Sequence, residues 1–243
     1  MPTGELTLYV VPASHPCAAV EYALKRKGLA YRRVDLMPLW HVVHQRVRFG
    51  RRTVPGLALP TGEKVVGSRA ILRVLDGLEP DPPLLPAGAA DRARVEAAEA
   101  WGESVLQPLV RRVLWAAAQV SPDALTSYSE GADLPIPASL AVKSAPVVVR
   151  LERLLNRSTD EAVREDLAAL AAHLDRADGY VAEGTIGGDP PNVADLQVAS
   201  SLRLVMTLDD LRPAIETRPS GQLALRLFPE YPGRIPSGSV ASA

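Results

Sequence analysis

The stretch LTLYVVPASHPCAAVEYALKRKGLAYRRVDL, residues 6–36, has the pattern of a strand, a helix and a second strand. The apolar, β-prone run 6–11 ends at Pro12, and a second such run begins at Tyr31. Between them, Pro16 suits the first turn of a helix, and Gly28 suits the position just after the last turn. A crossover of this length favours parallel pairing, so the stretch predicts a β-α-β unit.

The following residues extend this unit. Residues 39–49 predict an irregular segment or a short helix, residues 54–59 a third strand and residues 64–66 a fourth. A helix then begins with Ser68 at or near its N-cap, and its apolar residues recur at helical spacing. We therefore expect an α/β domain over residues 1–79.

A proline-rich segment separates this domain from a region of different composition. Residues 80–88 cannot continue a helix and predict a linker. The rest, residues 89–243, is rich in Ala, Leu, Glu and Arg and predicts an all-α domain, with a flexible tail from about residue 232. The predicted helices cover residues 91–120, 139–156, 159–178, 192–208 and 219–228. Asn192 and Asp195 have capping-box spacing, which we interpret as structural.

Composition limits the classes of function. The 243 residues carry a formal net charge of −1 and one cysteine, which excludes an internal disulfide and a thiolate-rich zinc site. No membrane-spanning run and no secretory signal are evident, so we expect a cytoplasmic protein with no membrane partner. Residues 1–79 have a surplus of basic residues that would attract a small anion. The same region has few aromatic residues and no nucleic-acid motif, so nucleic acid is not an expected partner.

The order of several short motifs resembles the glutathione transferase superfamily. These are Ser14-His-Pro16-Cys17 after the first strand, Val54-Pro55 before the third, Ser68-Arg-Ala-Ile-Leu72 after the fourth, the linker Leu84-Leu85-Pro86, and the capped helix at Asn192. The resemblance covers about the whole chain. It implies a thioredoxin-like N-terminal domain with a four-stranded mixed sheet, followed by an all-helical C-terminal domain. It also implies a homodimer.

The resemblance assigns two adjoining sites. The thiol co-substrate, glutathione or another low-molecular-weight thiol, would contact Val54, a cis Pro55, Ser68 and Arg69, with help from the basic segment. A small hydrophobic molecule would occupy a second pocket on the first helix of the C-terminal domain. The arginines of the basic segment are Arg48, Arg51 and Arg52, and the second-pocket residues are Arg111, Leu114 and Trp115.

The Ser14-His15-Pro16-Cys17 turn has the spacing of a dithiol redox motif, with a hydroxyl in place of the first thiol. A serine cannot form the mixed disulfide, so dithiol exchange is excluded. Ser14 would donate a hydrogen bond to a bound thiolate, the device of serine-type members of the family, or it would merely cap the helix. Cys17 would be a thiolate near the helix N-terminus or a buried, inert residue. We expect His15 on the surface beside the site.

Two further features bear on which ligands the protein binds. The family usually has Glu or Gln before the helix-start serine, to hold the γ-glutamyl end of glutathione, and this chain has Gly67. His41 and His44 have a spacing that could serve a metal or haem, but without a nearby acid or thiol we expect no metal.

Three readings follow. The first is an enzyme that conjugates a thiol to a hydrophobic electrophile, as in detoxification. The second is a non-catalytic carrier of an apolar ligand with the same fold, and the third is an interaction module.

Overall fold

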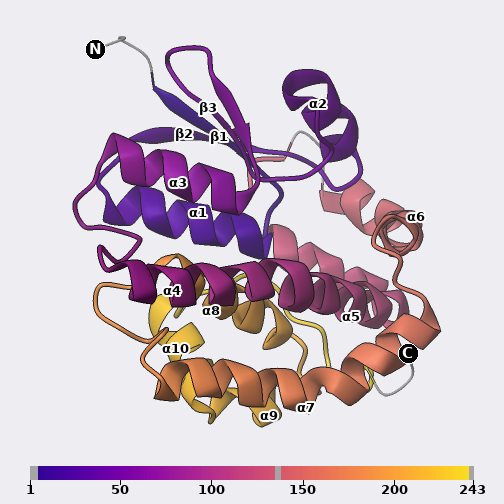
Figure 1. Cartoon of the computed structure of the whole chain (residues 1–243). Helices are drawn as coiled ribbons and strands as arrows, with labels where there is room; N and C mark the ends of the chain where they lie inside the picture. The colour runs from indigo at the N-terminus through magenta and orange to yellow at the C-terminus, as the bar shows by residue number, and fades with distance from the viewer. Residues whose placement is uncertain (1–4, 135–137, 241–243) are drawn as a thin grey trace.

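The computed structural model describes residues 5–134 and 138–240. Its first part contains a four-stranded sheet in the order β2-β1-β3-β4, in which β1 and β2 are parallel and the other pairs antiparallel. The predicted mixed sheet is thereby confirmed. Helices α1 and α3 lie together below the sheet in Figure 1, while α2 stands apart at its edge. The elements are β1 (Leu6–Val10), α1 (His15–Arg26), β2 (Tyr31–Asp35), α2 (Trp40–Phe49), β3 (Gly56–Ala58), β4 (Lys64–Val66) and α3 (Ser68–Leu78).

The β-α-β unit forms as its sequence predicts. All five residues of β1 are buried, because this strand lies between β2 and β3 and the helices α1 and α3 lie below the sheet. Helix α1 has Pro16 in its first turn and Lys25 and Arg26 in its last, where their charges suit the helix dipole. The chain then reverses at Gly28, whose φ of +64° lies in the left-handed region that favours glycine.

Beyond Gly88, the described residues form helices and one isolated bridge between Leu208 and Ile235, so the predicted helical region is confirmed. The predicted single helix 91–120 is wrong in one respect, because a π-helical turn interrupts it. There the N–H of Gln107 bonds to the carbonyl of Gly102, five residues earlier, and Pro108 has no N–H to continue the regular ladder. The elements are α4 (Ala89–Trp101), η1 (Gly102–Leu106), α5 (Gln107–Val120), η2 (Pro122–Ser129), α6 (Ala138–Leu155), α7 (Asp160–Ala182), α8 (Val193–Val205), α9 (Arg212–Glu216) and α10 (Pro219–Leu227).

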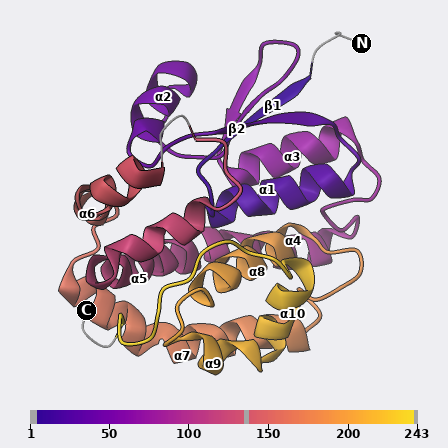
Figure 2. The ribbon, with the colours of Figure 1, turned by 180° about the vertical axis from the view of Figure 1, so that it is seen from behind.

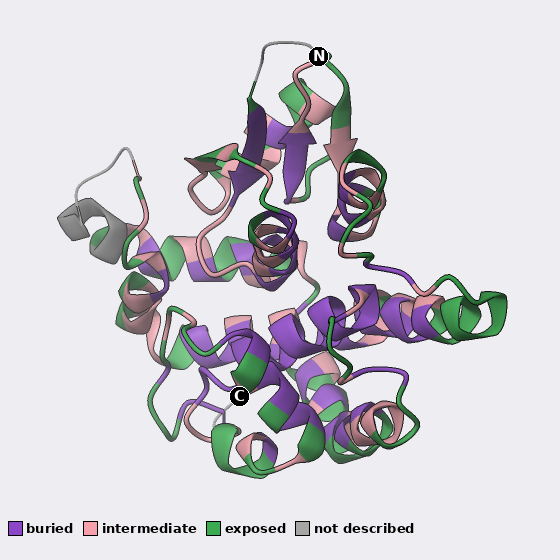
Figure 3. Ribbon diagram, turned by 90° about the vertical axis from the view of Figure 1, so that its left-hand side faces the viewer, coloured by how far each residue is buried: buried purple, intermediate pink, exposed green. Residues whose placement is uncertain are grey.

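Helix α8 lies at the centre of the helical region. Every residue from Val193 to Val205 is buried, because α1, α4 and α10 all pack against this helix. Figure 3 shows buried residues concentrated where the sheet region meets the helical region. The predicted capping box is confirmed: the Asn192 side chain accepts from the Asp195 N–H at 3.2 Å, and the Asp195 side chain accepts from the Asn192 N–H at 2.8 Å.

The predicted flexible tail is wrong for residues 232–240, and residues 241–243 lie outside the described range. Ile235 is fully buried, and its backbone bonds to Thr207 and Asp209. The Asp210 carboxylate accepts from the N–H groups of Gly238 and Val240, both at 2.9 Å. Figure 2 shows this segment running back across the helical region. Within the described ranges, no helix is long and apolar enough to span a bilayer.

Candidate active site

A cavity of about 460 Å³ lies between the sheet region and the helical region. The β1–α1 loop and the segment before β3 form one side, and α5, η2 and α6 form the other. The structure places six of the predicted site residues in its wall. These are Ser14, Arg52, Val54, Arg111, Leu114 and Trp115.

Ser14 is the N-cap residue of α1, but its side chain makes no capping hydrogen bond. Its backbone N–H bonds to the Val11 carbonyl at 3.1 Å, which fixes the loop that carries it. The Ser14 hydroxyl instead interacts with the Cys17 thiol one turn further on. Ser14 therefore lines the cavity, and its hydroxyl caps none of the backbone N–H groups of α1.

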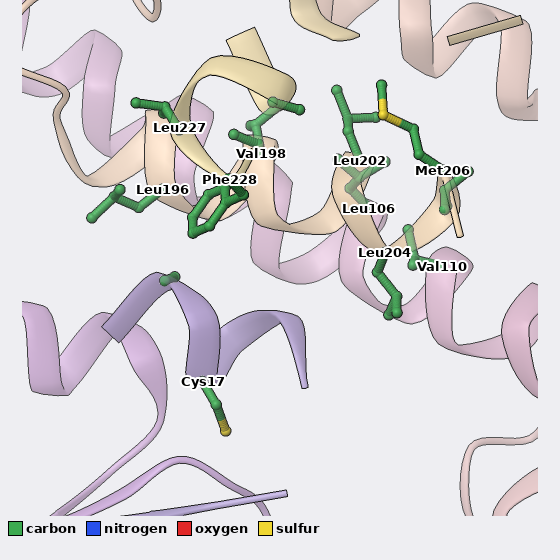
Figure 4. Packing of buried hydrophobic residues seen from close by; sticks show 14 of the residues in the cluster. Cys17, Leu106, Val110, Leu196, Val198, Leu202, Leu204, Met206, Leu227 and Phe228 are labelled. Atoms are coloured by element: carbon green, nitrogen blue, oxygen red, sulfur yellow. The ribbon is translucent and has the colours of Figure 1, made fainter. Parts of the chain in front are cut away.

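Cys17 lies behind Ser14 and is 2% exposed. Figure 4 shows its side chain pointing from α1 away from the labelled apolar residues of α8. Burial raises the pKa of Cys17 to about 12, although hydrogen bonds with Ser14 and the Val11 backbone act in the opposite direction. The thiol stays protonated at neutral pH, and its environment is that of a buried, inert cysteine.

The Val54–Pro55 peptide bond is cis, as the motif predicts. The Pro55 carbonyl accepts from the Gly67 N–H at 2.9 Å, which joins this loop to the start of α3. Val54 lines the cavity, and within the described ranges its backbone N–H and carbonyl form no hydrogen bond. Both groups are free to pair with a peptide-like ligand.

Ser68 and Arg69 differ from the sequence prediction. Ser68 is the first residue of α3 and Gly67 is the N-cap. The Ser68 hydroxyl is buried and accepts from the Gln197 side chain at 2.9 Å. Arg69 bonds to Glu99 and Glu103, both at 3.1 Å. Neither Ser68 nor Arg69 lines the cavity, and residues of α4, η1 and α8 that are distant in sequence occupy their polar groups.

The arginines of the basic segment separate into different environments. Arg52 lines the cavity. Arg48 lies over the ring of Tyr9, with its guanidinium carbon 4.9 Å from the ring centroid, and Arg51 is exposed. Only Arg52 of the three is brought to the cavity wall.

The two histidines of this segment also have separate environments. His41 lines the cavity, and burial lowers its pKa to about 4. The ring of His44 lies against Tyr9, with centroids 5.2 Å apart. No group of three potential metal ligands occurs within the described residues.

The sequence interpretation missed two residues of the cavity wall. His15, expected on the surface, is 1% exposed, and burial together with the nearby Arg111 lowers its pKa well below the usual value. Glu152 of α6 accepts hydrogen bonds from the Leu39 N–H at 3.3 Å and the Asn156 side chain at 3.0 Å, and burial raises its pKa. No local pattern marks Glu152, because its contact with the β2–α2 loop joins residues 113 positions apart.

Comparison with known proteins matches one domain of this chain and the fold of the whole. Residues 8–83 match the glutathione S-transferase N-terminal domain. Comparison with curated proteins gave no match. A glutathione S-transferase from Rhodospirillum rubrum is similar over 97% of this chain and 98% of its own, with 21% identity and a TM-score of 0.60. A glutathione transferase from Phanerochaete chrysosporium, GSTFuA3, is similar over 92% of this chain and 96% of its own, with 20% identity and a TM-score of 0.64.

A maleylacetoacetate isomerase from Anaeromyxobacter dehalogenans shares the fold at 22% identity over 90% of this chain and 84% of its own, with a TM-score of 0.55. A thioredoxin-like unit joined to a helical bundle, with a cavity where they meet, is therefore the fold class of the whole chain. The match over residues 8–83 shows a glutathione S-transferase N-terminal domain in the first third of the chain, where the sequence motifs predicted one.

Proposed function

We propose that this protein is an enzyme that transfers a low-molecular-weight thiol to a hydrophobic electrophile, as in detoxification. The observation that carries the proposal is that the Ser14 hydroxyl, the unpaired backbone of Val54 and the apolar groups of Leu114 and Trp115 line one cavity. The thiol and the electrophile would therefore bind in the same cavity, in direct contact with each other. The glutathione S-transferases that share this fold support a thiol as the co-substrate.

In the proposed reaction the bound thiol loses its proton to water. The Ser14 hydroxyl donates a hydrogen bond to the resulting sulfur anion, and the N-terminus of α1 adds a favourable partial charge. The thiolate attacks the electrophilic carbon, a carbon–sulfur bond forms, and the leaving group departs with its electron pair. The neutral Cys17 thiol takes no part, and no covalent enzyme intermediate arises.

The thiol itself need not be glutathione. The γ-glutamyl end of glutathione carries an amino group and a carboxylate. In this chain Gly67 has no side chain to receive the amino group, and the side chains of Ser68 and Arg69 are already paired. These observations support a thiol without that end, or glutathione bound weakly.

The same observations favour a second candidate, a carrier that holds an apolar ligand in the cavity without chemistry. The two candidates differ in one measurement, the formation of a thioether from a chloronitrobenzene and a panel of thiols. The enzyme should form product with at least one thiol, and Ser14→Ala should reduce its kcat/KM about ten-fold or more, which corresponds to ~1.4 kcal/mol.

Ser121→Ala is a suitable control for that assay, because Ser121 bonds to Ser239 outside the cavity. Product formation that Ser14→Ala leaves unchanged would exclude Ser14 as the group that stabilises the thiolate. Binding of an apolar ligand with no product from any thiol would favour the carrier. We further propose a cytoplasmic location and a homodimer, and light scattering of the purified protein tests the homodimer.

A further inference from the structure

Arg111 lies on α5 in the cavity wall, and no acidic side chain in the described part of the chain bonds to it. Its side chain is largely buried, and burial lowers its pKa, as do the charges of Arg112 and Arg52. The charges of Glu152 and Glu103 act on this pKa in the opposite direction. Among the described residues, its guanidinium forms neither an ion pair nor a hydrogen bond. The sequence between 135 and 142, whose side chains are not described, contains no acidic residue that would supply one.

The neighbouring arginine on the same helix shows the contrast. Arg112 faces away from the cavity and holds the Asp166 carboxylate through two hydrogen bonds of 2.6 Å. On α5, Arg112 therefore has an acidic partner, whereas Arg111, which lines the cavity, forms no ion pair among the described residues. A largely buried charge without a partner is costly, so an anion entering the cavity would gain a strong interaction with Arg111.

Two histidines in the same wall also lack partners. The Nε2 atom of His15 and the Nδ1 atom of His41 are buried without a hydrogen bond among the described residues. Both rings line the cavity, and the lowered pKa values keep both neutral at neutral pH. Arg111 is close enough to His15 to contribute to that lowering. Neither ring therefore adds a charge to the cavity wall beside Arg111.

The remaining wall defines the rest of the ligand. Its charged residues are three arginines and one glutamate, and the glutamate already accepts hydrogen bonds from Leu39 and Asn156. The volume of about 460 Å³ suits a single organic molecule. The charged residues are Arg52, Arg111, Arg157 and Glu152, and the apolar lining includes Val11, Met37, Leu114, Trp115, Leu125 and Val148.

We propose that the cavity binds an organic carboxylate with an aromatic or apolar body, and that Arg111 holds the carboxylate. The inference rests on the proposed function in taking this molecule as the second substrate, and it names the class to which that substrate belongs. The apolar body would lie against Leu114 and Trp115. Arg52 would add a second positive charge at the edge of the cavity near Val54.

Calorimetric titration with naphthoate and with its neutral amide, naphthamide, tests this without any thiol or turnover, so its result is independent of the transferase activity. The parent protein should bind naphthoate at least about ten-fold more tightly than naphthamide. Arg111→Gln should remove that preference by weakening naphthoate alone. Arg112→Gln is the matched control, with the same charge change on the same helix, and should keep the preference once circular dichroism confirms that it is folded.

Three results would overturn the proposal. They are equal binding of the two probes, binding of neither probe, and an equal loss of both in Arg111→Gln. Excess reduced glutathione distinguishes the two ligands: naphthoate should still bind, because a substrate and a thiol must occupy the site together. Displacement of naphthoate by glutathione would assign Arg111 to the thiol and would also overturn the proposal.

Discussion

The side-chain amide of Gln197, in the middle of α8, donates a 2.9 Å hydrogen bond to the hydroxyl of Ser68 at the start of α3. Gln197 in turn accepts from the Gln107 side chain at 2.8 Å, and all three side chains are buried. This chain of hydrogen bonds joins the sheet region to the helical region. It gives Ser68 a structural role at the junction and leaves its hydroxyl no free position facing the cavity.

Gln197→Leu should therefore destabilise the protein strongly. The change leaves the Gln107 amide and the Ser68 hydroxyl buried without this partner, at ~1–3 kcal/mol for each group. The free energy of unfolding from urea titration measures the loss. Gln222→Leu is the control, because Gln222 is exposed and bonds only to the nearby Glu216 carbonyl. Equal stability of the two variants would show that the buried chain contributes nothing.

Cys17 should be inert and should couple stability to alkaline pH. Its pKa is raised by burial from 9.0 to about 12, so the folded state holds its proton where the unfolded state loses it. The stabilising contribution is therefore complete below pH 9.0 and is lost as pH rises towards about 12. Urea titrations across this window should show a smaller fall for Cys17→Ala than for the parent.

The same burial predicts slow alkylation of the native thiol by iodoacetamide at about pH 8, and rapid alkylation in denaturant. In the transfer assay, Cys17→Ala should retain activity within a few-fold of the parent. A rapidly modified native thiol, or an inactive Cys17→Ala, would reverse the roles assigned to Ser14 and Cys17.

Glutathione should bind weakly, with a dissociation constant in the millimolar range, equivalent to ~4 kcal/mol. In the proposed site Val54 and Arg52 would contact the cysteinyl and glycyl parts, but the γ-glutamyl amino group would have no partner at Gly67. Calorimetric titration gives the constant, and a micromolar value would refute the prediction. Restoring an acid by Gly67→Glu is not a clean control, because Gly67 has a φ of +92° that strains any L side chain. A thiol without the γ-glutamyl group, such as cysteinylglycine, is the better comparison.

Asn192→Ala should lower the free energy of unfolding by ~1 kcal/mol, the usual value of an N-cap, or somewhat more. The Asn192 side chain also donates to the Thr185 carbonyl at 3.0 Å, so the change removes a second contact. Thr159→Ala is the matched comparison, because Thr159 caps α7 through a single bond to Ala162 on an exposed face. Thermal unfolding should show the larger shift for Asn192→Ala. A larger shift for Thr159→Ala than for Asn192→Ala would contradict the conclusion that the start of α8 contributes more to stability than the start of α7.

The parts of the fold that the sequence predicted are those with local causes. Pro16 and Gly28 mark the ends of α1, and the Asn192 and Asp195 pair marks the start of α8, each within a few residues of its hydrogen bonds. The apolar runs likewise predicted the strands to within one or two residues. Local capping and turn chemistry therefore accounts for the order of the elements.

The site was harder to predict because its contacts are distant in sequence. The sequence around Ser68 is that of a helix start, whether the serine binds a ligand or has only a structural role. Its hydroxyl is occupied by a hydrogen bond from Gln197, 129 residues later, which no local pattern could predict. His15 is the first residue of α1 and precedes a proline, a position typical of the surface, yet it is buried near Arg111 of α5. Arg111 and Arg112 are adjacent and identical in type, and only the position of Asp166 distinguishes them.

The hydroxyl of Tyr231 donates a 2.8 Å hydrogen bond to the carbonyl of Ala13, the residue that precedes Ser14. The loop that carries Ser14 is thus supported by a residue 218 positions later. During synthesis on the ribosome, the sheet region emerges early, but this loop lacks that hydrogen bond until residue 231 has been made. The sheet region alone would therefore lack one of the contacts that hold the cavity wall at Ser14, and a nascent chain would complete that wall late.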